Sequence, residues 1–392
     1  MGFDLQQLAR PNILKLKPYR CARDDYSEGV LLDANENAYG SSADFAYDGK
    51  NLSLHRYPDP RQEDVKSKMC ALRNVQNTDS TLTPLDPANM FVGVGSDEVI
   101  DALIRCFCVP GRDKILVCPP TYGMYSVCAD INDVGVVKVP LDASKQGFPL
   151  RTDAVVDALK QDPAIKILFL CSPGNPTAGL IDPAAVQQIL SLDWNGIVML
   201  DEAYIDFSAP GSSLAPWVTK YPNLVVSQTL SKAFGMAGIR IGMAFGNPEV
   251  IALMNNMKAP YNVSSLASEA ANRALDIWGI KLMLENVTKL NEQRDKVYET
   301  LQTVPGVGNV IGGFDANFLL FQVLDRNGNP SSETALKVYE KMAQIKGVVI
   351  RYRGNEYGCE GGLRATIGTA EENQLLLTHL RETIQEVHDE TS

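Results

Sequence analysis

From Phe91 onward, short apolar runs alternate with stretches of helical periodicity, and this alternation constrains the fold more than any other feature of the chain. Apolar residues from Val99 to Phe107 fall on one face of a helix predicted over residues 97–108. The apolar runs occupy residues 91–94, 114–118, 135–139, 166–171, 196–200, 224–227 and 242–245. This alternation is typical of βαβ units. It predicts an α/β fold with a mostly parallel central sheet flanked by helices.

Beyond residue 263 the apolar spacing lengthens. Steps of three and four from Met283 to Leu301 predict a long helix ending at Pro305-Gly306, and strands are predicted at 318–323 and 347–352. A terminal amphipathic helix follows. We therefore predict three parts, which are an N-terminal arm at 1–60, a large domain at 61–284 and a smaller α+β domain at 285–392.

Charge and composition exclude several classes of partner. The chain carries 36 Lys and Arg against 47 Asp and Glu, a net charge of −11, which disfavours nucleic acid and anionic membranes as partners. Its apolar runs are shorter than the roughly 18 residues of a membrane helix, and its first residues lack the apolar core of a signal peptide. We expect a cytoplasmic protein with reduced cysteines. Three histidines are a poor supply for a zinc site or a Ser-His-Asp triad, and no metal is expected.

Ligands in parallel α/β sheets bind beyond the carboxyl ends of the strands. Four apolar runs end in segments of unusual composition, and these are GVGSDE (93–98), SPGNPTAG (172–179), DEAY (201–204) and QTLSKAFGMAGIRIG (228–242). We expect these four segments to meet at one edge of the sheet.

The first segment suits a phosphate group. Gly95 and Ser96 at a helix start offer free backbone N–H groups and the positive end of the helix dipole. Ser96 is equally explained as a plain helix N-cap. The segment also resembles part of a dinucleotide fingerprint, but Glu98 stands where the third glycine belongs, which weakens a nicotinamide dehydrogenase as the interpretation.

The last segment indicates an amine nucleophile beside an anion site. A lysine in a partly desolvated pocket has a lowered pKa and can form a Schiff base, and Lys232 follows a strand end. Thr229, Ser231 and Arg240 can hold a phosphate next to it. The alternative for Lys232 is an ordinary surface lysine.

The second and third segments supply the remaining groups. Asp201 would be a costly buried carboxylate without a cation, and a pyridinium N–H is such a cation. Asn175 and Tyr204 can donate to a phenolate oxygen, and Tyr122 can stack on a ring. Pyridoxal 5′-phosphate matches the whole set, because its aldehyde, ring nitrogen, phenolate and phosphate each find a counterpart.

The chain resembles the fold-type-I aminotransferases over essentially its whole length, and most closely their histidinol-phosphate branch. The segments that carry the resemblance are LLDANEN (31–37), HRYPDP (55–60), GVGSDE, PPTYGMYS (119–126), SPGNPT, DEAY, TLSKAFGMAGIR (229–240), VVIRYRGN (348–355) and LRATIGT (363–369). The resemblance implies the fold of a pyridoxal-phosphate-dependent transferase.

It also implies a role for each site residue. Lys232 would be the Schiff-base lysine and proton carrier, and Asp201 the partner of the ring nitrogen. Asn175 and Tyr204 would contact the phenolate oxygen and Tyr122 would stack. The phosphate would be held by Ser96, Asp97 through its backbone N–H, Thr229, Ser231 and Arg240.

Substrate and subunit contacts follow from the same resemblance. Tyr57 would reach the phosphate of the neighbouring subunit, which implies a homodimer with shared sites. Arg364, helped by Arg351, would grip the anionic end of the substrate, and Asn35 would close over it. The implied reaction of histidine biosynthesis transfers an amino group between L-histidinol phosphate and 2-oxoglutarate. An aromatic amino-acid aminotransferase or a phosphothreonine decarboxylase on the same fold remains the alternative.

Two positions depart from the family pattern. Ala178 separates Asn-Pro-Thr from its usual glycine, and Asn37 stands where many relatives carry an aromatic residue. A pyridoxal-dependent DNA-binding regulator is disfavoured, because no part of the chain is left for a helix-turn-helix module and the net charge is acidic.

Overall fold

The computed structural model describes residues 25–26, 28–33, 35–40 and 58–390. Among these residues, seven strands form a large sheet, in the order β2 (Met90–Val94), β8 (Ile241–Gly246), β7 (Leu224–Thr229), β6 (Ile197–Asp201), β5 (Ile165–Cys171), β3 (Lys114–Val117) and β4 (Gly135–Lys138). Only β8 runs antiparallel to its neighbours. The predicted mostly parallel sheet is confirmed, and every predicted apolar run is a strand whose ends lie within two residues of the prediction.

Helices cover both faces of the large sheet. They are α2 (Glu63–Gln76), α3 (Gly95–Phe107), α4 (Met124–Ile131), α5 (Thr152–Gln161), α6 (Pro183–Leu190), α7 (Pro248–Met257) and α8 (Ser265–Ala274). Successive strand side chains point to opposite faces. In β6, Val198 and Leu200 therefore pack in one apolar cluster with α5 and α6, whereas Ile197 and Met199 pack in another with α3, α4 and α7. Short 3-10 turns lie at Pro87–Asn89, Ile205–Phe207, Ala215–Thr219 and Ala237–Ile239.

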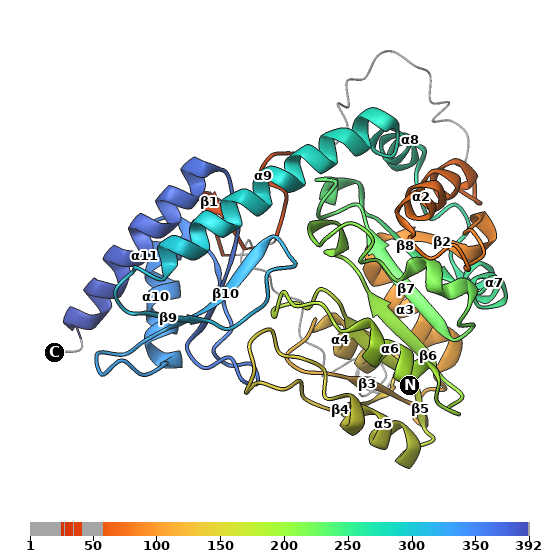
Figure 1. Cartoon of the computed structure of the whole chain (residues 1–392), viewed down its shortest axis with the longest axis horizontal. Coiled ribbons are helices and arrows are strands. Elements are labelled where there is room, and N and C mark those ends of the chain that lie inside the picture. The colour runs from red at the N-terminus through yellow and green to blue at the C-terminus, as the bar shows by residue number, and fades with distance from the viewer. Residues whose placement is uncertain (1–24, 27, 34, 41–57, 391–392) are drawn as a thin grey trace, which may run out of the picture.

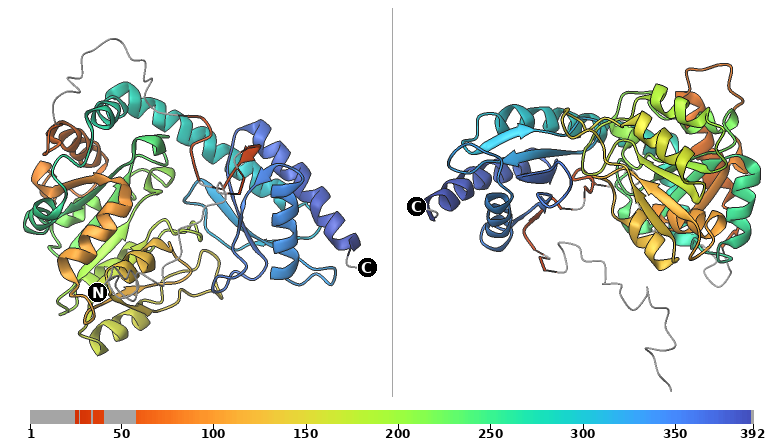
Figure 2. Two further views of the ribbon diagram at one scale, coloured as in Figure 1. Left: turned by 180° about the vertical axis from the view of Figure 1, so that it is seen from behind. Right: turned by 90° about the horizontal axis from the view of Figure 1, so that it is seen from below.

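A smaller antiparallel sheet lies beside the large one (Figure 1). Its order is β12 (Arg351–Tyr352), β13 (Gly362–Thr366), β10 (Phe318–Val323) and β9 (Val307–Val310), and α10 (Ser332–Gln344) and α11 (Ala370–Glu390) pack on it. Figure 2 shows the long helix α9 (Ile277–Leu301) running from the large sheet to the small one. The expected long helix, strand 318–323 and terminal helix are all present.

The strand predicted over 347–352 is two strands. β11 (Val348–Val349) pairs in parallel with β1 (Val30–Leu31) of the N-terminal arm, whereas β12 pairs antiparallel with β13. A strand divides here because its two halves pair with different partners.

The boundary proposed between residues 284 and 285 falls inside α9, and the three-part division stays a prediction. Much of the arm at 1–60 lies outside the described residues. Among the helices of the described ranges, none combines the length and the apolar character needed to cross a bilayer.

Candidate active site

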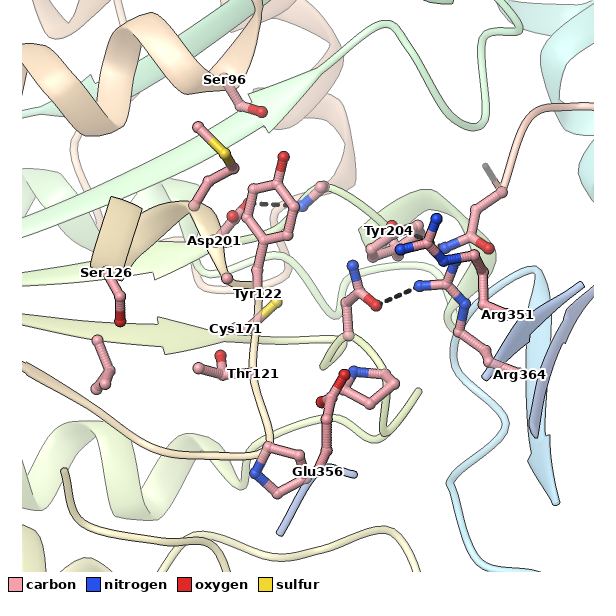
Figure 3. A pocket seen from close by; sticks show the side chains of 18 of the residues that line it. Ser96, Thr121, Tyr122, Ser126, Cys171, Asp201, Tyr204, Arg351, Glu356 and Arg364 are labelled. Carbon is pink, nitrogen blue, oxygen red and sulfur yellow. Dashed lines mark hydrogen bonds between the residues drawn. The ribbon is translucent and has the colours of Figure 1, made fainter. Parts of the chain in front are cut away.

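One cavity of about 540 Å³ opens where the carboxyl ends of β5, β6 and β7 meet the small sheet and the arm (Figure 3). Every described residue that the sequence places in the site lines it, and these are Asn35, Ser96, Asp97, Tyr122, Asn175, Asp201, Tyr204, Thr229, Ser231, Lys232, Arg240, Arg351 and Arg364. Tyr57 lies outside the described residues. The predicted site residues that the structure describes therefore line a single cavity, and their roles stay predictions.

Lys232 lies in the loop that follows β7. The Gly235 N–H donates to the Lys232 carbonyl oxygen at 3.0 Å and closes this loop. Lys232 Nζ lies 5.8 Å from the centre of the Tyr204 ring. Burial lowers the pKa of Lys232 to about 8, and the positive charges of Arg364 and Arg240 act in the same direction. Near neutral pH a useful fraction of this amine is uncharged and nucleophilic.

Asp201 ends β6 and is only 2% exposed. Three neutral groups donate to it, which are the Tyr125 hydroxyl at 2.7 Å, the Ser227 hydroxyl at 3.0 Å and the Ala203 N–H at 3.2 Å. Burial raises its pKa despite these bonds. A cation in the pocket would therefore stabilise this carboxylate.

Tyr125 is a site residue that the sequence interpretation missed. It sits on α4, is fully buried and stacks on Phe169 with the ring centres 4.8 Å apart. Tyr122 precedes this helix, and the two tyrosine rings meet edge to face with their centres 5.6 Å apart. Both belong to the PPTYGMYS segment, which was the available signal.

A cradle of hydrogen-bond donors lies between the start of α3 and the loop after β7. The Thr229 and Ser231 hydroxyls are 2.9 Å apart, and Arg240 Nη1 donates to Ser231 at 3.4 Å. A Cβ on Gly95 would lie 2.5 Å from Arg240 Nη2, so only glycine allows the arginine this approach. The Asp97 carboxylate contacts two of the surrounding groups. It forms an ion pair with Arg240 Nη2 at 3.9 Å, and it accepts a hydrogen bond from the Tyr122 hydroxyl at 3.1 Å.

The alternative reading of Ser96 as a plain N-cap is wrong. The helix begins at Gly95 and Val94 is its N-cap, so Ser96 lies inside the first turn. Glu98 takes the capping role, because its carboxylate accepts the Val94 N–H. The Gly95 N–H, expected to be free for a phosphate, donates instead to the Arg240 carbonyl oxygen at 3.0 Å, while the next N–H groups of the first turn have no acceptor within the helix.

Asn175 and Tyr204 connect the large sheet to the small sheet and the arm. Arg364 Nη1 donates to Asn175 Oδ1 at 2.5 Å, and Arg364 Nη2 donates to the Asp33 carbonyl oxygen at 2.9 Å. Asn35 Nδ2 donates to the Tyr204 hydroxyl at 3.0 Å. Each of these contacts joins groups more than a hundred residues apart in the chain.

The small sheet contributes the positive wall. Arg351 and Arg364 are opposite each other in the β12–β13 register, and both face the cavity (Figure 3). Arg364 is 3% exposed, and its Nε has no hydrogen-bond partner among the described residues. Burial, with the charges of Arg353 and Arg351, lowers the pKa of Arg364 to about 9. The positive charge of this wall favours the binding of an anion.

Arg353 and Glu356 also line the cavity and were missed. They form an ion pair with N–O distance 2.9 Å, at the beginning of the turn after β12. The only sequence signal for this pair was Arg353 itself, the second arginine of the segment 351–353.

The two departures from the family pattern have structural consequences. Ala178 adopts a left-handed backbone with φ 54°, a conformation that glycine adopts without strain. Asn37 is buried, and its Nδ2 donates to the Ala233 carbonyl oxygen at 2.9 Å. It thereby ties the arm to the residue next to Lys232.

A family model described as aminotransferase class I and II matches residues 27–380. The chain belongs to this family. It is 52% identical to the histidinol-phosphate aminotransferase of Schizosaccharomyces pombe, over 98% of this chain and 99% of that protein. It is 48% identical to that of Saccharomyces cerevisiae over the full length of both.

Solved structures agree on the fold. The histidinol-phosphate aminotransferase of Sinorhizobium meliloti, in complex with pyridoxal-5′-phosphate, superposes with a TM-score of 0.80 at 19% identity, covering 97% of this chain and 98% of that one. The enzyme from Clostridium acetobutylicum gives 0.75 at 23% identity, covering 91% and 99%. The predicted aminotransferase fold is confirmed.

Proposed function

We propose that this chain is a pyridoxal 5′-phosphate-dependent transaminase that converts L-histidinol phosphate and 2-oxoglutarate to imidazole acetol phosphate and L-glutamate. The observation that carries the proposal is one cavity in which the Lys232 amine, the Asp201 carboxylate and the arginine wall face each other. The identity of about half of all residues to named histidinol-phosphate aminotransferases over the full length supports the substrate pair.

The residues present fit the cofactor. Asp201 is buried among neutral donors and gains from a protonated ring nitrogen, and Gly95 leaves room for Arg240 beside the cradle. We assign the phosphate to Ser96, the Asp97 N–H, Thr229, Ser231 and Arg240, the phenolate oxygen to Asn175 and Tyr204, and stacking to Tyr122. When bound, pyridoxal phosphate supplies an aldehyde that captures amines and a ring that accepts electrons.

Lys232 carries the covalent attachment and the proton transfer. With cofactor and a substrate amine bound, Lys232 Nζ would remove the proton from the carbon that bears the substrate nitrogen, and would later return a proton. A pKa of about 8 suits both tasks, because a base works best when its pKa is close to the working pH.

Asp201 holds the proton on the ring nitrogen. In a water-poor site its negative charge stabilises the positive ring more strongly than it would in water. The Tyr125 and Ser227 hydroxyls fix the orientation of the carboxylate, since each donates to a different oxygen.

The arginine wall binds the anionic end of both substrates. Two guanidinium groups at one end of the cavity can hold either a phosphate dianion or a carboxylate, through paired hydrogen bonds. The Arg364 Nε supplies a further donor.

We also propose a homodimer with shared sites and a cytoplasmic location. Tyr57 would serve the neighbouring site, as the family resemblance implies. The described cysteines are free thiols, as is usual in a reducing compartment.

Glutamate formation from L-histidinol phosphate and 2-oxoglutarate tests the proposal. Purified protein with added cofactor should produce glutamate, and phenylalanine or phosphothreonine in place of histidinol phosphate should react far more slowly. Preference for phenylalanine would favour the aromatic transaminase, and release of carbon dioxide from phosphothreonine would favour the decarboxylase. Either result would contradict the proposed substrate.

A further inference from the structure

We propose that Asn35 and Thr366 form a hydrogen-bond relay that forces the Tyr204 hydroxyl to direct its proton into the cavity, which makes both of them positioning residues. The inference rests on the proposed function, because the acceptor of that proton would be the phenolate oxygen of the cofactor.

The relay begins at a donor whose direction is fixed. The backbone N–H of Asn35 can only donate, and it donates to Thr366 Oγ1 at 3.0 Å. The Thr366 hydroxyl therefore accepts at this contact and keeps its own proton for another one. Asn35 Oδ1 lies 2.7 Å away and accepts that proton.

The second step fixes the amide. Because Asn35 Oδ1 faces Thr366, Nδ2 faces the Tyr204 oxygen, to which it donates at 3.0 Å. With the amide reversed, the Thr366 proton would face an NH₂ group. Thr366 is 2% exposed, so its proton would then be buried without this acceptor, which is costly. The network favours a single orientation.

The last step fixes the tyrosine. Its oxygen accepts from Asn35, so the phenolic proton points elsewhere. Tyr204 is 4% exposed and lines the cavity on the side of Arg351 and Arg364 (Figure 3). The remaining direction for the proton is the cavity, where an anionic oxygen is the preferred acceptor.

The rest of the arm holds Asn35 in place. Asn317 Nδ2 donates to the Asn35 carbonyl oxygen at 3.0 Å, and Arg364 anchors Asp33. Asn35 is 2% exposed, and both polar atoms of its side chain are already engaged. It therefore acts through Tyr204, rather than by the direct substrate contact that the family resemblance implies.

Replacement of the Asn35 amide by a carboxylate tests the direction in which the Tyr204 hydroxyl donates its proton. In Asn35→Asp both side-chain oxygens accept, so one of them draws the Tyr204 proton out of the cavity. In the holoenzyme we expect the pH midpoint of the visible absorbance of the lysine-bound cofactor to rise by about one unit, a tenfold change in proton affinity. An unchanged midpoint would overturn the relay.

The added negative charge could raise the midpoint by itself, and a double-mutant cycle separates the two causes. If the relay acts through the hydroxyl, Asn35→Asp should shift the midpoint much less in a Tyr204→Phe background than in the wild-type background. Equal shifts in the two backgrounds would show a pure charge effect and overturn the relay.

Thr366 offers a matched pair that adds no charge. Thr366→Val removes the hydroxyl at constant shape and should raise the midpoint, whereas Thr366→Ser keeps the hydroxyl and should retain the wild-type value. Equal midpoints in both variants and the wild type would contradict the relay. A wild-type chain that fails to colour with pyridoxal phosphate would instead overturn the proposed function, and the relay with it.

Discussion

Lys232 and Asp201 lie in one pocket where burial disfavours the charge of each. It lowers the pKa of the amine to about 8 and raises the pKa of the carboxyl. A positively charged ring nitrogen would restore the charge on Asp201, while an aldehyde would consume the neutral form of Lys232. The two side chains are thus prepared for one partner that has both groups.

The Lys232 pKa predicts how cofactor capture depends on pH. Only the neutral amine attacks an aldehyde. When pyridoxal phosphate is added to the cofactor-free protein, the rate of the absorbance change should therefore rise with pH, with a midpoint of about 8. Arg364→Met removes a nearby positive charge and should move the midpoint upward. Arg381→Ala, an exposed arginine on α11, is the control and should leave it unchanged. Stopped-flow absorbance measures this, and a midpoint near the ordinary 10.5 would contradict it.

Arg364 predicts a binding defect that is common to both substrates. Loss of its charge-assisted hydrogen bonds in Arg364→Ala should raise the KM for histidinol phosphate and for 2-oxoglutarate by about 10- to 100-fold. Steady-state kinetics with each partner varied in turn measures it, with Arg381→Ala as the control. A normal KM for either partner would show that this partner's anion binds elsewhere.

The site residues predicted from the sequence share a simple signal. Each lies just after an apolar run or within one of the segments that carry the family resemblance. Glu356 lacks it, whereas Tyr125 and Arg353 lie within PPTYGMYS (119–126) and VVIRYRGN (348–355) beside residues with more obvious roles. Tyr125 belongs to an amphipathic helix, and Arg353 and Glu356 to a polar turn, so each reads locally as ordinary. Only the packing of distant segments brings Arg353 and Glu356 to the cavity and Tyr125 to Asp201.

At the scale of elements, apolar runs predict the strands well, because strands buried on both faces are apolar almost throughout. Pairing partners are harder to predict. The division of 347–352 into β11 and β12 depends on β1 and β13, which lie far away in the chain. The start of α3 at Gly95 likewise depends on Glu98 reaching back to Val94.

The end of β6 carries a second buried carboxyl, Glu202, which points away from the cavity. It accepts from the Ser213 hydroxyl, the Leu214 N–H and Gln228 at 2.6–2.8 Å. Arg73 supports this cluster through Gln228 at 2.8 Å and through an ion pair with Asp206 at 2.7 Å. Burial raises the pKa of Glu202 to about 7.

Glu202 predicts a pH slope in stability. Between about pH 4.5 and 7 the folded chain keeps a proton that the unfolded chain releases, so the free energy of unfolding falls as pH rises and levels off above 7. The total effect is on the order of 3 kcal/mol. Urea unfolding at several pH values should show this slope in the wild type and in the exposed control Glu249→Gln. It should be reduced in Glu202→Gln, and an equal slope in all three would contradict the prediction.

At the scale of the whole molecule, the site is complete only where two sheets and the arm meet. Asn35 and Asn37 tie the arm to Tyr204 and to the Lys232 loop, and Arg364 ties the small sheet to Asn175. The resemblance to a family anticipates this meeting, whereas local pattern alone does not.

Shared sites predict complementation between two defective chains. Lys232→Ala and Tyr57→Phe subunits should each form impaired homodimers. A mixed dimer, however, holds one site with both native residues. Random mixing should restore activity to about a quarter of the wild-type level, since half the dimers are mixed and each has one intact site. Activity no higher than the sum of the two parents would contradict the shared site.

The most direct test of the account is borohydride reduction of the protein loaded with pyridoxal phosphate, followed by peptide mass analysis. Reduction fixes the Schiff base, so the account predicts one phosphopyridoxyl group per chain on the peptide that contains Lys232. A label on another lysine, or no label on a protein that stays colourless with added cofactor, would contradict it.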